Sequence, residues 1–234
     1  MRKFRSVILP CVAYLIAIPA VIALGVLLWK SERYGLISML VALLACVPFF
    51  AFFERRRTSA RELVTLSVMT ALSVVGRLLF TPIPAFKPVS ALTVITGIAF
   101  GPVAGFVTGS MSAVVSNIFF GQGPWTPFQM LIWGLIGFVS GVIFKRGKPP
   151  HPVALIVMGV LSGAFYSIGM DVWTTLSGDG GFSLSAYLAY AAASLPTTIS
   201  YAVSNVVFLL LLTRPMLHKT ERLRVKHGVF GGEQ

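Results

Sequence analysis

Apolar residues dominate this chain in eight runs, and short polar or charged stretches separate each run from the next. The runs cover 7–29, 34–53, 62–80, 89–101, 103–120, 125–144, 153–175 and 184–212. Most of them match the roughly 20 apolar residues that an α-helix needs to cross a bilayer. The pattern predicts an all-α integral membrane protein with about eight spans, in which a two-helix hairpin precedes a six-helix core.

Proline and charge divide these runs further. Gly101-Pro102 should end the fourth helix, because proline lacks an N–H and disfavours helix in the residue before it. The last run is long and contains Pro196, so we expect a kink or a tilt there. The basic run 54–61 separates the hairpin from the core. We therefore expect three parts: a hairpin with its linker (1–61), the core (62–213) and a basic cytoplasmic tail (214–234).

The composition agrees with a membrane protein. The chain is 56% hydrophobic and 11% charged, with a mean hydropathy of +0.86. A soluble domain has about 25% charged residues, so lipid must cover most of this surface. The net charge of +12 would also suit a nucleic-acid-binding protein. The basic residues lie in short loops between apolar runs, however, and this favours the bilayer as partner rather than nucleic acid.

The distribution of Lys and Arg predicts the orientation. With the N-terminus inside, 15 of the 19 basic residues fall in inside loops, three fall in outside loops, and Arg77 lies within a span. Cytoplasmic loops carry the excess of Lys and Arg, so both termini should be cytoplasmic. The loops 81–88, 121–124 and 176–183 then face outward, which makes them candidates for capturing a solute.

Polar side chains near the outer ends of core helices point to one site. Asn117, Gln129 and Asp171 would leave hydrogen-bonding groups unpaired if they faced lipid, so we expect them to converge on a cavity open to the outside. Arg77 and Asp171 are the ionised side chains well inside core spans. They could pair with each other or contact a ligand, and the sequence favours neither. Glycines at helical spacing are interpreted as packing contacts, because small residues allow close helix approach in lipid.

Other chemistry finds little support in the motifs. The sequence contains no Gly-x-x-x-x-Gly-Lys-Ser/Thr loop, no His-Glu-x-x-His and no Cys-x-x-Cys. We therefore expect no catalytic activity, no catalytic cofactor and no metal site. Two alternatives stay open: a self-sufficient secondary transporter of a small organic solute, and an intramembrane enzyme.

The core resembles the S components of energy-coupling factor (ECF) vitamin transporters. The resemblance rests on Phe86-Lys87-Pro88 and on the segments 97–105, 112–127 and 133–138. It implies a six-helix subunit that captures a vitamin at the outer face of the cell membrane. It also implies a transmembrane coupling subunit and two cytosolic ATPase subunits as partners, so that ATP is used by the partners only. Among the branches of the family, the chain looks most like the cobalamin-transporting one.

The expected site residues follow from the polar side chains of the core helices, the outer loops and the resemblance together. The residues expected to bind the substrate are Arg77, Phe86, Lys87, Asn117, Gln122, Trp125, Gln129, Trp133, Asp171 and Tyr201. Partner docking is expected at Ser67 and Ala71, where S components carry two small residues one turn apart on the first core helix. The N-terminal hairpin has no counterpart in the S components that the core resembles.

Overall fold

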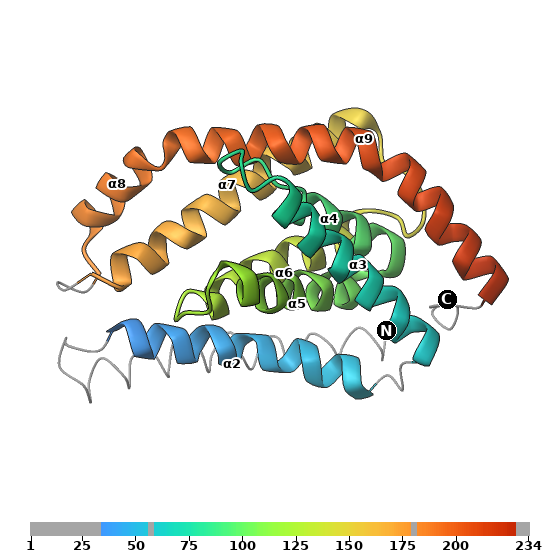
Figure 1. Cartoon of the computed structure of the whole chain (residues 1–234), viewed down its shortest axis with the longest axis horizontal. Coiled ribbons are helices and arrows are strands. Elements are labelled where there is room, and N and C mark those ends of the chain that lie inside the picture. Colours follow the sequence, from blue (N-terminus) through green and yellow to red (C-terminus); the bar gives the residue numbers. More distant parts are fainter. Residues whose placement is uncertain (1–33, 56–58, 179–181, 228–234) are drawn as a thin grey trace.

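A computed structural model describes residues 34–55, 59–178 and 182–227 of the chain, all of which belong to helices or their connections (Figure 1). The described helices are α2 (Tyr34–Arg55), α3 (Ala60–Leu79), α4 (Val89–Phe100), α5 (Pro102–Phe120), α6 (Thr126–Ile143), α7 (Pro152–Leu176), α8 (Leu184–Ala193) and α9 (Leu195–His227). Five of them, α3, α5, α6, α7 and the Leu195–Leu223 part of α9, are long and apolar enough to cross a membrane. The expected all-α membrane protein is confirmed. The expected first helix, 7–29, lies outside the described residues.

Local sequence signals explain several helix ends. Ser59 caps α3 in a capping box, since its hydroxyl accepts a hydrogen bond from the Glu62 N–H (3.3 Å) and the Glu62 carboxylate accepts one from the Ser59 N–H (3.1 Å). Gly101 separates α4 from α5 with φ of 100°, and Pro102 begins α5 where a missing N–H costs nothing. The expected end of the fourth helix at Gly101-Pro102 is confirmed.

The C-terminal run differs from its prediction. Residues 184–212 form not one kinked helix but two helices, because α8 ends at Ala193 and α9 begins at Leu195. Pro196 occupies the first turn of α9, where proline is tolerated, so it starts a helix instead of bending one. Helix α9 also continues to His227, so much of the expected tail is helical.

The short helix α4 lies at the centre of the core, and each of its 12 residues is buried. Glycines bring α4, α5 and α6 together. A side chain at Gly105 would collide with the backbone of Gly137, and one at Gly109 would collide with the backbone of Trp133. These contacts confirm that the glycine stripes serve close packing, as expected for helices in lipid.

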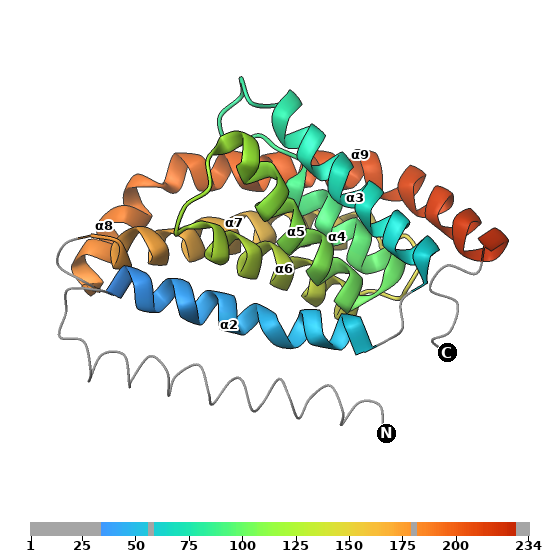
Figure 2. The ribbon, with the colours of Figure 1, turned by 60° about the horizontal axis from the view of Figure 1, so that its bottom comes forward.

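The remaining helices surround this centre. In both ribbon views α2 lies along the side of α5 and α6 (Figure 2), and Phe49 of α2 stacks on Phe106 of α5 at 3.8 Å between ring centroids. On another side α7 packs against α9, where Gly163 faces the backbone of Ala202. The second helix of the expected hairpin therefore contacts the core directly.

Candidate functional site

Polar and aromatic side chains from five helices and one loop meet inside the bundle. They come from α3, the 80–88 loop, α5, α6, α7 and α9, and we call them the polar–aromatic cluster. Its members, all buried or half-buried, are Arg77, Lys87, Ser116, Asn117, Phe120, Thr126, Gln129, Trp133, Tyr166 and Tyr201. Buried polar groups are retained where they are hydrogen bonded or serve function, so this cluster is the strongest candidate site.

Arg77 holds the positive charge of the cluster. The side chain is buried on α3, and its Nη1 donates to Ser116 Oγ and to Asn117 Oδ1 (2.8 Å). The guanidinium carbon lies 4.4 Å from the ring centroid of Phe120 and 5.2 Å from that of Trp133. Both distances are within cation–π range, so two aromatic rings partly replace the water that burial removes.

Amide side chains connect the helices around this charge. Asn117 Nδ2 donates to Gln129 Oε1 (2.7 Å) and to Thr126 Oγ1 (2.9 Å), which links α5 to α6. Gln129 Nε2 in turn donates to the Tyr166 hydroxyl on α7 (3.1 Å). The predicted proximity of Asn117 and Gln129 is confirmed. Because each amide has its own described partners, the chain of hydrogen bonds runs from Arg77 to Tyr166 without a ligand.

Aromatic rings form the other wall of the cluster. Trp133 and Tyr166 are stacked, with centroids 4.9 Å apart and planes 10° from parallel. The Tyr201 ring meets Tyr166 edge-on at 4.9 Å. Such pairs are stable in these two geometries, and here both stacked rings are buried. Trp133 and Tyr201, both expected to bind the substrate, thus lie in the same cluster, and their contact with a substrate stays a prediction.

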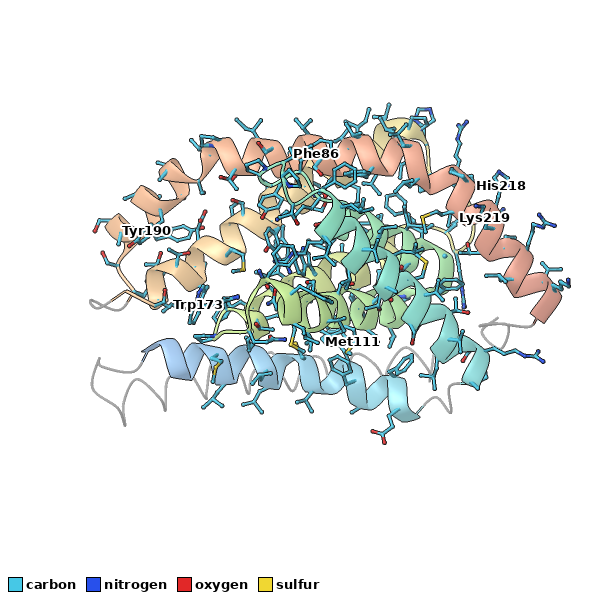
Figure 3. The ribbon with its side chains drawn as sticks, in the orientation of Figure 1. Phe86, Met111, Trp173, Tyr190, His218 and Lys219 are labelled. Atoms are coloured by element: carbon cyan, nitrogen blue, oxygen red, sulfur yellow. The ribbon has the colours of Figure 1, made fainter. Side chains whose placement is uncertain are left out.

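The loop between α3 and α4 brings a second cation to the cluster. Lys87 Nζ lies 5.1 Å from the ring centroid of Phe120, and the Lys87 carbonyl accepts a hydrogen bond from Ser204 Oγ on α9 (3.0 Å). Phe86 packs on Phe208 of α9 with 5.3 Å between ring centroids, and Figure 3 shows Phe86 beside that helix. Ala85 adopts a left-handed conformation with φ of 57°, which costs a non-glycine residue about 1–2 kcal/mol. The loop is therefore held against α9 by specific contacts.

Four expected substrate residues lie outside the polar–aromatic cluster: Phe86, which packs on Phe208, and Gln122, Trp125 and Asp171. Gln122 is exposed. Its Nε2 donates to the Val114 carbonyl and its Oε1 accepts a hydrogen bond from Thr126 Oγ1 (3.1 Å), so it touches the cluster at Thr126 and holds the 121–125 connection. Trp125 is 37% exposed, and its ring covers Gly123. Asp171 is buried, but its carboxylate accepts a hydrogen bond from Ser194 Oγ (2.7 Å) at the junction of α8 and α9.

The Arg77–Asp171 ion pair left open by the sequence does not form among the residues that the structure describes. Arg77 bonds to α5, whereas Asp171 bonds to Ser194, which lies between α8 and α9. In the same described part of the chain, no group of three or more His, Cys, Asp or Glu side chains could hold a metal ion.

Sequence reasoning missed four members of the cluster: Ser116, Phe120, Thr126 and Tyr166. Ser116 and Phe120 flank Asn117 and face the same interior. Tyr166 lies on α7 between Phe165 and Ser167, and it was not singled out from the sequence. The signal that could have found it is its hydroxyl, because a buried tyrosine needs a hydrogen-bond partner.

The expected docking residues lie on a different face of α3 from Arg77. Ser67 and Ala71 are exposed, whereas Thr70, Ser73 and Arg77 on the neighbouring face are buried. The separation of an outward small-residue face from an inward polar face therefore agrees with the expectation. Docking itself stays a prediction.

Comparison with protein families places the chain. The matching family model is described as "ECF-type riboflavin transporter, S component", and the match covers residues 57–219. The chain therefore belongs to the ECF S components, which are membrane-embedded substrate-binding subunits of importers and not a family of enzymes. Comparisons with curated proteins and with solved structures found no match.

Proposed function

We propose that this protein captures a vitamin with a planar ring system at the outer face of the cell membrane. Capture is assigned to the core, residues 62–213. The observation that supports this most directly is the polar–aromatic cluster, where stacked rings lie beside hydrogen-bonding amides. Aromatic side chains pack favourably against flat rings, and amides recognise the C=O and N–H groups along such a ring's edge.

Riboflavin is the first candidate substrate. The description of the matching family names it, and the isoalloxazine ring combines a flat aromatic face with a carbonyl-rich edge. Cobalamin, which the sequence resemblance favoured, is the competing candidate. The cluster offers amides and ring faces at close quarters, which suits a small planar vitamin better than a bulky corrin.

Delivery into the cell is proposed to need partners. A transmembrane coupling subunit would contact Ser67 and Ala71 on the exposed face of α3, and two cytosolic ATPases would supply ATP hydrolysis. The excess of basic residues in the loops 54–61 and 145–148 supports cytoplasmic termini and an outward-facing site.

Binding by purified protein tests the substrate. Riboflavin fluorescence is titrated with the protein in detergent, and cyanocobalamin is added as competitor. We expect riboflavin fluorescence to be quenched when riboflavin stacks on the aromatic rings of the protein. Cyanocobalamin should not reverse this quenching. Trp133→Phe should weaken binding about 2- to 10-fold, since aromatic contacts contribute about 0.5–1.5 kcal/mol.

Trp125→Phe is the matched control, because Trp125 lies outside the cluster and should bind as the wild type does. Equal loss in both variants, or displacement of riboflavin by cyanocobalamin, would contradict the assignment of the site or of the substrate.

A further inference from the structure

Two cations share one aromatic ring at the centre of the site. The guanidinium of Arg77 and the ammonium of Lys87 both lie against Phe120. Burial, and next the neighbouring Arg77 charge, lower the pKa of Lys87. The two positive charges therefore oppose each other within a partly desolvated site.

No described carboxylate compensates these charges. Asp171 bonds to Ser194, and Glu54, Glu62 and Glu221 lie near the basic ends of α2, α3 and α9. Among the described residues, neither Arg77 nor Lys87 forms an ion pair. Arginine stays protonated in proteins, so it cannot escape the cost of burial by losing its proton.

The hydrogen bonds of Arg77 are also incomplete. Both described acceptors, Ser116 and Asn117, are neutral, and both bind Nη1. The N–H groups on Nε and Nη2 have no acceptor among the described residues. A guanidinium presents its donors as a planar fork that matches two oxygens of a carboxylate or phosphate. A carboxylate or a phosphate would both accept hydrogen bonds from the unused donors and supply the missing negative charge.

We propose that the substrate carries an anionic group, a phosphate or a carboxylate, which binds between Arg77 and Lys87 while its ring contacts the aromatic wall. This inference rests on the proposed function. It narrows the candidate substrates from vitamins with a planar ring to those that also carry a negative charge. The anion would supply the charge and the acceptors that the described chain lacks. If the substrate is a flavin, the proposal predicts that riboflavin 5′-phosphate or another acidic flavin binds more tightly than riboflavin itself.

The test compares ligands that share a ring and differ in charge. Riboflavin, riboflavin 5′-phosphate and 10-carboxymethylflavin are titrated against the full chain in phosphate-free buffer. Pantothenate against pantothenol, and biotin against biotin amide, are measured in parallel by thermal stabilisation. We expect the anionic member of a pair to bind at least tenfold more tightly. The two acidic flavins distinguish phosphate from carboxylate as the preferred group.

Three variants locate the effect. Arg77→Gln and Lys87→Gln each remove one charge, and Asn117→Asp places a carboxylate beside Arg77 at nearly unchanged volume. Each should reduce the preference for the anion at least fivefold. Lys148→Gln, in the exposed loop before α7, is the charge-matched control and should leave the preference unchanged. Asn117→Asp keeps the inference testable if a variant lacking Arg77 fails to fold.

The outcomes separate this inference from the function on which it rests. If riboflavin binds as tightly as both acidic flavins, or if Asn117→Asp keeps the preference, the anion site is refuted and vitamin capture stands. If no flavin binds but an acidic vitamin binds better than its neutral partner, the flavin assignment fails and the anion site stands. Binding of no ligand in the panel refutes both.

Discussion

Replacing Asn117 by alanine distinguishes a substrate site from a group of side chains that only join helices by hydrogen bonds. The Asn117 side chain bonds to Arg77, Thr126 and Gln129, all of them buried. Arg77 and Thr126 keep other described partners when Asn117 is lost. Only Gln129 Oε1 loses its single described donor. The loss of unfolding free energy should therefore be that of one orphaned buried group, about 1–3 kcal/mol.

If the cluster holds the ligand, Asn117→Ala should also weaken the free energy of substrate binding, by an amount similar to the loss of unfolding free energy. Without Asn117, Gln129 turns and Arg77 loses one anchor, so the groups facing the ligand are no longer preorganised. A loss of about 1–3 kcal/mol raises Kd about 5- to 150-fold. The assay pairs a riboflavin fluorescence titration with thermal melting of the ligand-free protein. Gln129→Ala should behave in the same way.

Asn205→Ala is the matched control for this experiment. Asn205 is equally buried and donates to Ser162 Oγ (3.2 Å), but it belongs to the α7–α9 contact outside the cluster. It should lower the melting temperature and leave Kd unchanged. If Asn117→Ala also melts early and yet binds normally once folded, the amides only join helices and the assignment of the site is wrong.

Three further predictions address orientation, docking and charge. A cysteine that replaces the exposed Gln122, in a cysteine-free background, should react with a membrane-impermeant maleimide in intact cells. Reaction only after lysis would show that this loop faces the cytoplasm and would contradict the proposed orientation. Ser67→Leu combined with Ala71→Leu should keep ligand Kd and abolish uptake, because bulk prevents close helix approach, and a parallel loss of binding would mean a misassigned face. Binding of riboflavin 5′-phosphate should fall as pH rises through the Lys87 pKa, which burial lowers from its usual value, since the neutral amine no longer attracts the anion. Lys87→Arg should remove this fall, and an unchanged pH profile in that variant would exclude Lys87 as its origin.

Local signals in the sequence determined most helices. The observed α3, α5 and α6 begin and end within two residues of their predicted ranges, because hydrophobic length, Gly101-Pro102 and the loop residues act over a few positions. The same locality explains why Asn117 and Gln129 could be brought together. They flank one short connection, so two successive antiparallel helices must hold them at similar depth.

Tertiary structure alone decided which side chains meet across distant helices. Arg77 bonds to α5 rather than to Asp171, and Tyr166 enters the cluster through its contact with Gln129. Both outcomes depend on how each helix is rotated and how deep it sits, and neither quantity is encoded within a single apolar run. The division of 184–212 at Ser194 involves both kinds of information: Pro196 in the first turn of α9 is a local signal, whereas the hydrogen bond from Ser194 to Asp171 joins the junction to α7, a partner that the local pattern does not contain.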